Sequence, residues 1–194
     1  MKSASGEFDV TCMAWHEAGH AVCSLALPGR PPVVRLSIEP GDEAFGFMRT
    51  EHAERLNETE SGLLDLIAVE LAGIISERKF LNMVTTSGGG DLKASYQLAF
   101  NMVVRFGMGE QVGFVCPGAA SADEISAFAA RNAAKVEADI AGIIDTARHR
   151  AEQALAANST LVEAVADALR NRKTLTGDDI GKLQQADFNC KIQN

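Results

Sequence analysis

Two histidines four positions apart, in the segment AWHEAGHAV (14–22), constrain the fold more than any other feature of this chain. The segment is rich in alanine and has a helical pattern, so His16 and His20 project from one helix face about 6 Å apart. Burying an apolar helix face that carries two unpaired imidazoles is costly. The fold must therefore bring polar partners or a metal ion to them.

The same segment has the pattern of a zinc-binding catalytic helix. At this spacing two ring nitrogens can share one ion at about 2.0–2.1 Å each. Glu17 points about 100° around the helix from His16, which suits contact with a water in the ion's open position better than ligation. The H-E-x-x-H pattern therefore predicts two ligands and a general base. The alternative is a chance pairing on a core helix, but the small neighbours Ala18, Gly19 and Ala21 leave room for an ion and a substrate.

A third ligand has to come from elsewhere, and three candidates are weak. Cys23 lies on the same helix, but three ligands on one straight helix would span about 10 Å, so it is predicted to be a small core residue. His149 lies between two arginines on a predicted long helix, and His52 lies in the polar stretch TEHAER. Both are predicted to face solvent.

Three carboxylates are better candidates. Glu70 and Glu77 lie on a predicted long helix and can approach the histidines from across the core. Asp91 ends the glycine-rich segment SGGGD and lies at or near the N-cap of a predicted helix, where a carboxylate is favoured. Spacing alone does not decide between Glu77 and Asp91.

The spacing of apolar residues predicts a mainly α protein with a small β-sheet, an α+β fold. The histidine-bearing helix is expected over 10–27. Two strands, VVRLSIEP (33–40) and FGFMRT (45–50), would form a two- or three-stranded sheet beside it. Further helices are expected over 58–81 and 91–106.

The C-terminal part is predicted to be helical throughout. Ser121 and Glu124 form a capping box that opens a very long helix. That helix is broken at Asn158-Ser159, and a partner helix follows around 161–169. The two are expected to pair as a helical hairpin, and a short final helix is expected over 176–184.

Length and charge exclude several classes of function. A chain of 194 residues suggests one domain, and its 46% hydrophobic and 23% charged residues are typical of globular proteins. The net charge of −8 argues against nucleic acid and anionic membranes as partners. No apolar run reaches the roughly 20 residues of a membrane span, and no export signal is visible, so a cytoplasmic location with reduced cysteines is expected.

Several motifs, taken in order, resemble the FtsH family of membrane-bound AAA proteases. AWHEAGHAV is similar to the zinc helix of that family, LSIEP…FGF to its strand pair, and LAGIISER to its next helix. TTSGGGDL resembles the family's T-T-G-A-x-x-D-L segment. FNMVVRFGMGEQVGFV and TLTGDDIGKL resemble two further segments. The resemblance extends from about Thr11 to Leu183.

This resemblance implies a zinc peptidase site. His16, His20 and Asp91 correspond to the zinc ligands, and Glu17 corresponds to the general base. Asp91 is favoured over Glu77 by the resemblance and not by spacing. Glu77 is then expected to be an acceptor that fixes the tautomer and orientation of a ligating imidazole.

The resemblance also implies a domain organisation. Residues 1–194 would form a single FtsH-type peptidase domain, with a zinc-binding catalytic part at 11–115 and the hairpin and final helix at 121–184. The segment SGGG departs from the family pattern, so a looser loop before Asp91 is expected. The family's ATPase module and membrane helices have no counterpart here, and no G-x-x-x-x-G-K-[ST] phosphate loop is present.

The leading hypothesis is therefore a zinc metalloendopeptidase that cleaves unfolded proteins or peptides. Its substrate is expected to lie along Phe45, Gly46, Phe47 and Met48, although this strand would equally suit packing over the first helix. A separate ATPase and a homo-oligomer are the expected partners. The alternative is a non-catalytic zinc-binding regulatory or adaptor domain that binds protein partners.

Overall fold

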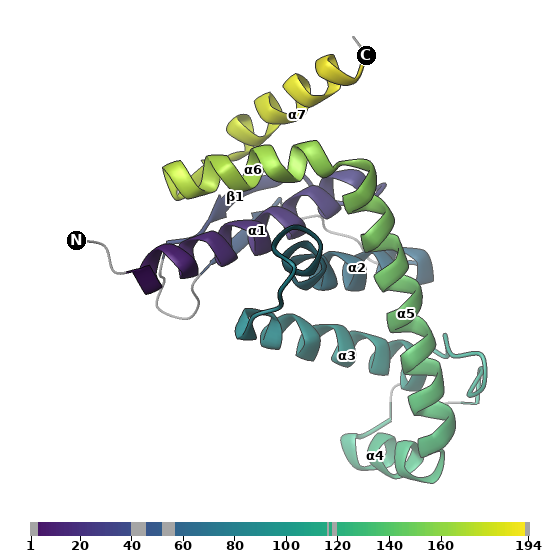
Figure 1. The fold of residues 1–194 in the computed structure, drawn as a ribbon. Coiled ribbons are helices and arrows are strands. Elements are labelled where there is room, and N and C mark those ends of the chain that lie inside the picture. Colours follow the sequence, from purple (N-terminus) through teal and green to yellow (C-terminus); the bar gives the residue numbers. More distant parts are fainter. Residues whose placement is uncertain (1–3, 40–45, 52–56, 116, 118–119, 193–194) are drawn as a thin grey trace.

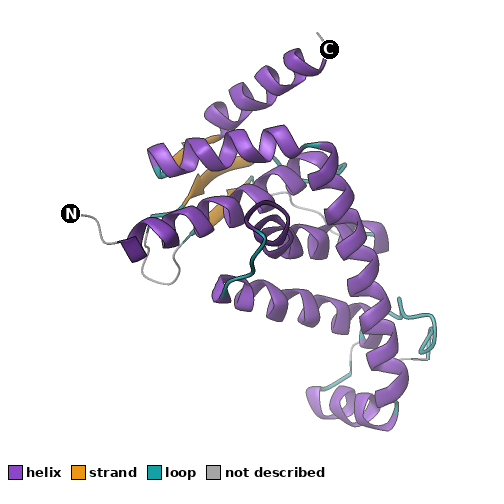
Figure 2. Ribbon diagram, in the orientation of Figure 1, coloured by secondary structure: helices purple, strands orange, loops and turns teal. Residues whose placement is uncertain are grey.

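The computed structural model describes residues 4–39, 46–51, 57–115, 117 and 120–192. Most of the ribbon is helical, and a small sheet lies to one side (Figures 1 and 2). The predicted mainly α architecture with a small β-sheet is confirmed. Within the described residues, no helix combines the length and the apolar character needed to cross a membrane.

Two helices form the centre of the fold. Helix α1 spans Ala4–Ala26 and α2 spans Glu60–Ser76, where the Thr59 side chain caps the first turn. A π-helical turn, Glu77–Leu81, extends α2 until Asn82 ends it in a left-handed conformation. Helix α1 packs mainly against α2 and α6 (Ser159–Arg172), while α2 packs against α1, α3 (Gly89–Val104) and α5 (Ala133–Ala157).

The sheet has three antiparallel strands in the order β2-β1-β3. Strand β1 (Val33–Ser37) is central, and β2 (Phe47–Thr50) and β3 (Thr174–Thr176) lie on either side. Leu36 points into the core between Met48 and Leu175, its partners on the neighbouring strands. The third strand lies at the start of the segment expected to form the final helix, and this helix, α7 (Gly177–Ile192), extends beyond the expected end at 184.

Helix α3 (Gly89–Val104) follows a short 3-10 turn, Thr86–Gly88. It begins two residues before the expected start, so Asp91 lies in its first turn, while Gly88 is the N-cap. The free N–H groups of a first turn still favour a carboxylate at this position.

The very long helix predicted from Ser121 is wrong as a single element. It is divided into α4 (Ala122–Arg131) and α5 (Ala133–Ala157) at Asn132, although the capping box at Ser121 is present as expected. The Asn132 amide donates to the carbonyl of Phe128, and such side-chain bonds compete with helical ones.

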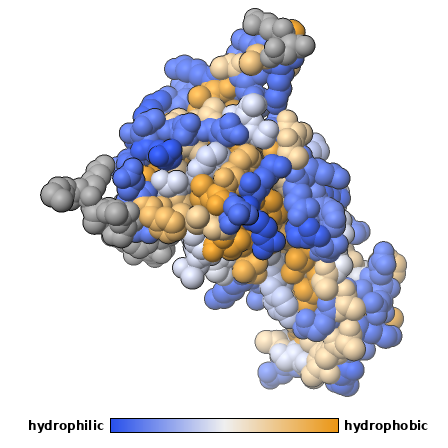
Figure 3. Space-filling model, viewed as in Figure 1, coloured by the Kyte–Doolittle hydropathy of each residue, from blue (hydrophilic) through white to orange (hydrophobic). Residues whose placement is uncertain are grey.

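The last two long helices do not pair side by side as the expected hairpin would require. Asn158 alone separates α5 from α6 (Ser159–Arg172), and the two run at a steep angle in Figure 1. Helix α6 makes most of its contacts with α1, and α5 makes most of its own with α2. On the face shown in Figure 3, hydrophilic residues predominate over α6, whereas hydrophobic ones gather toward the middle of the molecule and along the lower half of α5.

Candidate metal centre

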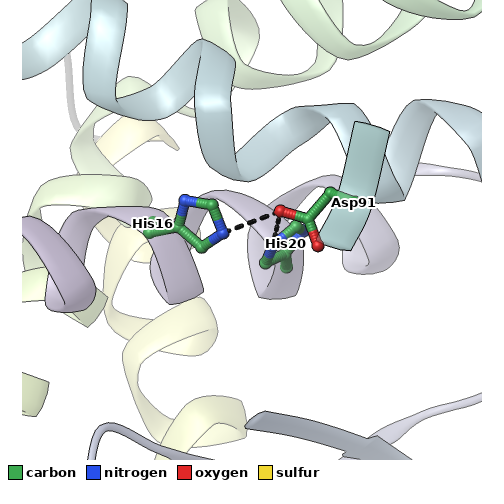
Figure 4. A group of neighbouring side chains, drawn as sticks. All are labelled: His16, His20 and Asp91. Carbon is green, nitrogen blue, oxygen red and sulfur yellow. Dashed lines mark hydrogen bonds and ion pairs between the residues drawn. The ribbon is translucent and has the colours of Figure 1, made fainter. Parts of the chain in front are cut away.

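Helix α1 presents both predicted histidines to α2 and α3. His16 and His20 are buried, with exposed fractions of 3% and 8%, and their rings meet edge to face. Figure 4 shows the two imidazoles on one side of α1, next to the carboxylate of Asp91 on α3. Ligand atoms of these three residues all lie within 4.8 Å of one another.

Asp91 reaches both histidines with one oxygen. Its Oδ2 lies 2.9 Å from Nε2 of His16 and 3.6 Å from Nε2 of His20. Burial alone would raise the pKa of Asp91, but hydrogen bonds with His16 and His20 outweigh it and hold the pKa well below its usual range. The carboxylate is therefore ionised and can balance a positive charge between the rings.

The other ring nitrogen of each histidine is held by an acceptor. Nδ1 of His16 lies 2.7 Å from Oε1 of Glu77, and Nδ1 of His20 lies 2.7 Å from the carbonyl oxygen of Val69. A carbonyl accepts only from N–H, so His20 carries its proton on Nδ1 and directs Nε2 toward Asp91. Glu77 favours the same tautomer of His16.

Glu77 is fixed by the loop that leads to α3. This fully buried carboxylate accepts from the Thr85 N–H at 2.6 Å and from the Ser87 hydroxyl at 2.8 Å. Burial would raise the pKa of Glu77, but the hydrogen bonds from His16, Ser87 and Thr85 lower it. The predicted looseness of the SGGG segment is thus offset at Ser87, whose hydroxyl ties the loop to Glu77.

The site favours a positive charge. Burial alone would lower the pKa of His16, but hydrogen bonds with Asp91 and Glu77 raise it to about 9. The two Nε2 atoms therefore face an anion and attract either protons or a metal cation. Two imidazoles and one carboxylate, with an open position remaining, form a ligand set typical of catalytic zinc.

The backbone of α2 leaves space for such an ion. A Cβ atom added at Gly73 would stand 2.6 Å from Nε2 of His20 and 2.7 Å from Nε2 of His16. The absence of a side chain at Gly73 thus leaves the space beside both Nε2 atoms clear. The small residues of α1 serve another purpose than the one expected: Ala18 and Ala21 are core residues, and Gly19 packs directly on Ala72 of α2.

Glu17 lies beside the three converging groups and is 4% exposed. Its Oε2 has no hydrogen-bond partner among the described residues, and burial raises its pKa. Glu17, both histidines and Asp91 line a cavity of about 690 Å³. A buried carboxylate oxygen without a partner is unfavourable for a fold, and its position in the wall of the cavity suits a chemical role.

The other residues considered as ligands are not among the three converging groups or lie outside the described residues. Cys23 is buried in the core, and His149 is exposed and bonded to Asp145 of its own helix, as expected for residues outside the site. Glu70 is half-buried on α2 and is not one of the three converging ligands. His52 lies outside the described residues.

The residues of the predicted substrate segment also differ in whether they are described and whether they line the cavity. Phe45 lies outside the described residues, and Gly46 lines the cavity next to Glu17. Phe47 is exposed at 37%, while Met48 is half-buried against the core. Of the described part of this segment, Gly46 alone reaches the cavity.

Sequence reasoning missed the N-terminal half of α1. Phe8, Asp9, Cys12 and Met13 line the cavity, although the helix was expected to begin only at residue 10. The signal was available, because positions three, four, seven and eight before His16 share its helix face.

The fold and the site together define a class: a metallopeptidase-type centre made by an H-E-x-x-H helix and a carboxylate from a second helix. Comparison with known proteins agrees, since the family model described as "Peptidase family M41" matches residues 7–183. The chain belongs to this family.

Curated relatives match over most of this chain. The ATP-dependent zinc metalloprotease FtsH of Magnetococcus marinus is 31% identical over 179 residues, which is 88% of this chain and 27% of the relative. The ATP-dependent zinc metalloprotease FtsH 1 of Thermoanaerobacter sp. is 31% identical over 186 residues, 91% of this chain and 30% of the relative. The chain thus spans less than a third of the length of these relatives.

Proposed function

We propose that this chain is a zinc metalloendopeptidase domain, in which His16, His20 and Asp91 hold the ion and Glu17 is the general base. The observation that carries the proposal is the convergence of three ligand atoms within 4.8 Å beside the buried Glu17 carboxylate, whose Oε2 has no hydrogen-bond partner among the described residues. The relatives support the identity of the metal, because they are named zinc metalloproteases.

The protein residues have distinct parts in hydrolysis. Zinc, when bound, would supply a Lewis acid for the scissile carbonyl and the attacking water. Glu17 accepts the water's proton and delivers it to the leaving amine, and the raised pKa of its buried carboxyl increases its proton affinity. Glu77 and the Val69 carbonyl hold the imidazoles in position during this transfer.

The substrate is proposed to bind as an extended strand beside β2. This strand lies at one side of the described sheet, and Gly46, directly before it, lines the cavity within reach of Glu17. A Cβ atom at Gly46 would stand 2.5 Å from Oε1 of Glu17, so the absence of a side chain here keeps the space beside the base free. Backbone pairing along an edge strand accepts many sequences, which suits unfolded chains.

A separate ATPase is the proposed source of energy for folded substrates. The relatives are named ATP-dependent, and the matched region covers less than a third of them. Unfolding a typical domain requires about 5–15 kcal/mol, which peptide hydrolysis at this site does not supply. The non-catalytic adaptor alternative is not favoured, because such a domain has no use for Glu17 in a destabilising position.

Zinc content and cleavage of casein, compared between the wild type and Glu17→Gln, test the proposal. The wild type is expected to bind zinc near stoichiometry and to cleave casein, whereas Glu17→Gln keeps the zinc and loses hydrolysis. Loss of zinc in Glu17→Gln would make Glu17 a ligand, and equal cleavage by both proteins would remove its role as base.

A further inference from the structure

The exposed face of the sheet carries two arginines around one phenylalanine. Arg35 on β1 and Arg49 on β2 are directly opposite each other in the register, so both side chains lie on the same face. Their guanidinium carbons lie 5.7 and 5.9 Å from the centre of the Phe47 ring. Since both distances fall within the range of cation–π contacts, Phe47 holds the two cations near each other.

These two cations have no carboxylate within ion-pair distance among the residues that the structure describes. Two described acids next to the sheet are engaged elsewhere: Glu39 accepts from Thr174, and Asp179 accepts from Thr176 and pairs with Arg172. Glu51, directly after β2, is exposed and forms an ion pair with neither arginine. Like charges opposite each other on a sheet are unfavourable, and here they occur in a chain of net charge −8. An external anion would remove this repulsion.

The arginines lie close to the path proposed for the substrate. Gly46 lines the cavity, and Arg49 is three residues further along the same segment, which corresponds to about 10 Å of strand. The guanidinium group of Arg35 lies against the Phe47 ring, so it reaches from β1 to the edge strand β2. A peptide that pairs with β2 would place alternate side chains beside Phe47 and both guanidinium groups.

We propose that Arg35, Phe47 and Arg49 form a subsite that selects acidic side chains a few positions away from the scissile bond. The proposal rests on the proposed peptidase function and on strand pairing with β2. Phe47 supplies an apolar floor, and the two guanidinium groups pair with an Asp or Glu carboxylate of the substrate. Because the subsite is exposed to solvent, its preference is modest and sensitive to salt.

Matched fluorogenic peptides test the subsite. They share one scissile bond and carry Asp, Asn or Lys at the second and fourth positions from it. The wild type is expected to cleave the Asp peptide with a kcat/KM about three to ten times that of the Asn peptide, mainly through KM, and the Lys peptide more slowly than both. The ratio of Asp to Asn should approach one in about 0.5 M salt.

Variants test whether the preference for the Asp peptide depends on the two arginines. The double variant Arg35→Gln/Arg49→Gln should bring the ratio close to one, while Arg131→Gln, an exposed arginine on the distant helix α4, should leave it unchanged (Figure 1). A ratio of one in the wild type, or a preference that persists in the double variant, would overturn the proposal.

A binding measurement separates this proposal from the peptidase function. Labelled Asp and Asn peptides are titrated by fluorescence anisotropy into zinc-loaded Glu17→Gln protein, with and without the two arginine substitutions. Tighter binding of the Asp peptide that depends on the arginines supports the subsite even if the wild type cleaves neither peptide. Equal binding refutes the subsite even if both peptides are cleaved.

Discussion

Replacing Gly73 with alanine puts one methyl group against the rings of both histidines. The new carbon would stand 2.6 Å from Nε2 of His20 and 2.6 Å from Cε1 of His16. Ordinary contact requires about 3.4 Å or more, so the rings must withdraw by about 0.8 Å. Metal–ligand distances tolerate only about 0.2 Å, so zinc binding is the property most affected.

The expected changes in the zinc affinity and thermal stability of Gly73→Ala follow from two opposing effects. Overpacking a site costs about 1–3 kcal/mol, which corresponds to a loss of zinc affinity of about 5- to 150-fold if the strain is relieved by moving the ligands. Alanine also has a higher helix propensity than glycine, by about 1 kcal/mol. The metal-free variant should therefore lose little thermal stability, whereas the zinc-loaded variant should lose several degrees relative to the wild type.

Gly142→Ala is the matched control. Gly142 lies within α5, and a Cβ atom there would meet nothing within 4 Å, so the control gains helix propensity without a clash. Zinc affinity is measured by competition with a chelator, and melting temperatures are measured with and without zinc. If Gly73→Ala binds zinc as tightly as the wild type and Gly142→Ala do, the proposed convergence of the two Nε2 atoms on an ion is wrong.

Three further predictions follow from the site and its surroundings. Asp91→Asn should lower zinc affinity more than Glu77→Gln does, because Asp91 faces both Nε2 atoms while Glu77 acts only through His16. Loss of the Glu77 carboxylate should lower zinc affinity by about 10–100-fold. If a chelator titration gives the reverse order, Glu77 is the ligand and Asp91 acts indirectly. Burial raises the pKa of the Cys23 thiol to about 12, so iodoacetamide at neutral pH should modify exposed Cys190 well before Cys23, as followed by peptide mass spectrometry. Purified protein should cleave an unfolded substrate at a rate that ATP does not change and should leave a tightly folded one intact; degradation of the folded substrate that ATP accelerates would point to an energy source within residues 1–194.

Local patterns predicted the elements whose apolar residues repeat without interruption. Helix α2 and the first two strands follow from such patterns, and Asn158 was recognised as a break. Asn132 was not, because Val136 and Ile140 continue the apolar period beyond it. Both asparagines donate to the carbonyl four residues earlier, and this local bond is not visible in periodicity.

Tertiary pairing was harder to predict than the elements themselves. The third strand has three residues and pairs with β1, in which Arg35 lies opposite Thr176, far along the chain. It follows Lys173, whose positive φ of 65° no pattern indicates. The hairpin prediction assumed that consecutive helices pair with each other. Helix α6 instead covers α1, because α1 has apolar residues on the side away from α2 as well.

The placement of the candidate site's residues was predicted in part, and their roles are proposals. His16, Glu17 and His20 follow from one local pattern, and the structure brings Asp91 to both histidines. Spacing could not choose between Asp91 and Glu77 because both contact His16, on opposite nitrogens of one ring. Choosing between them requires the orientation of that ring, which no sequence pattern contains.

That orientation depends on α2 as much as on α1. Val69, Gly73 and Glu77 follow one another at intervals of four residues, so they form a single stripe along α2 and the turn after it. The stripe supplies the carbonyl that holds His20, the cleared space beside both rings, and the carboxylate that holds His16. Ser76, next to this stripe, donates to the Trp15 carbonyl at 2.6 Å, and this bond fixes the position of α2 along the axis of α1. An H-E-x-x-H helix is thus half of this centre, because the position of its imidazoles is set by the helix packed against it.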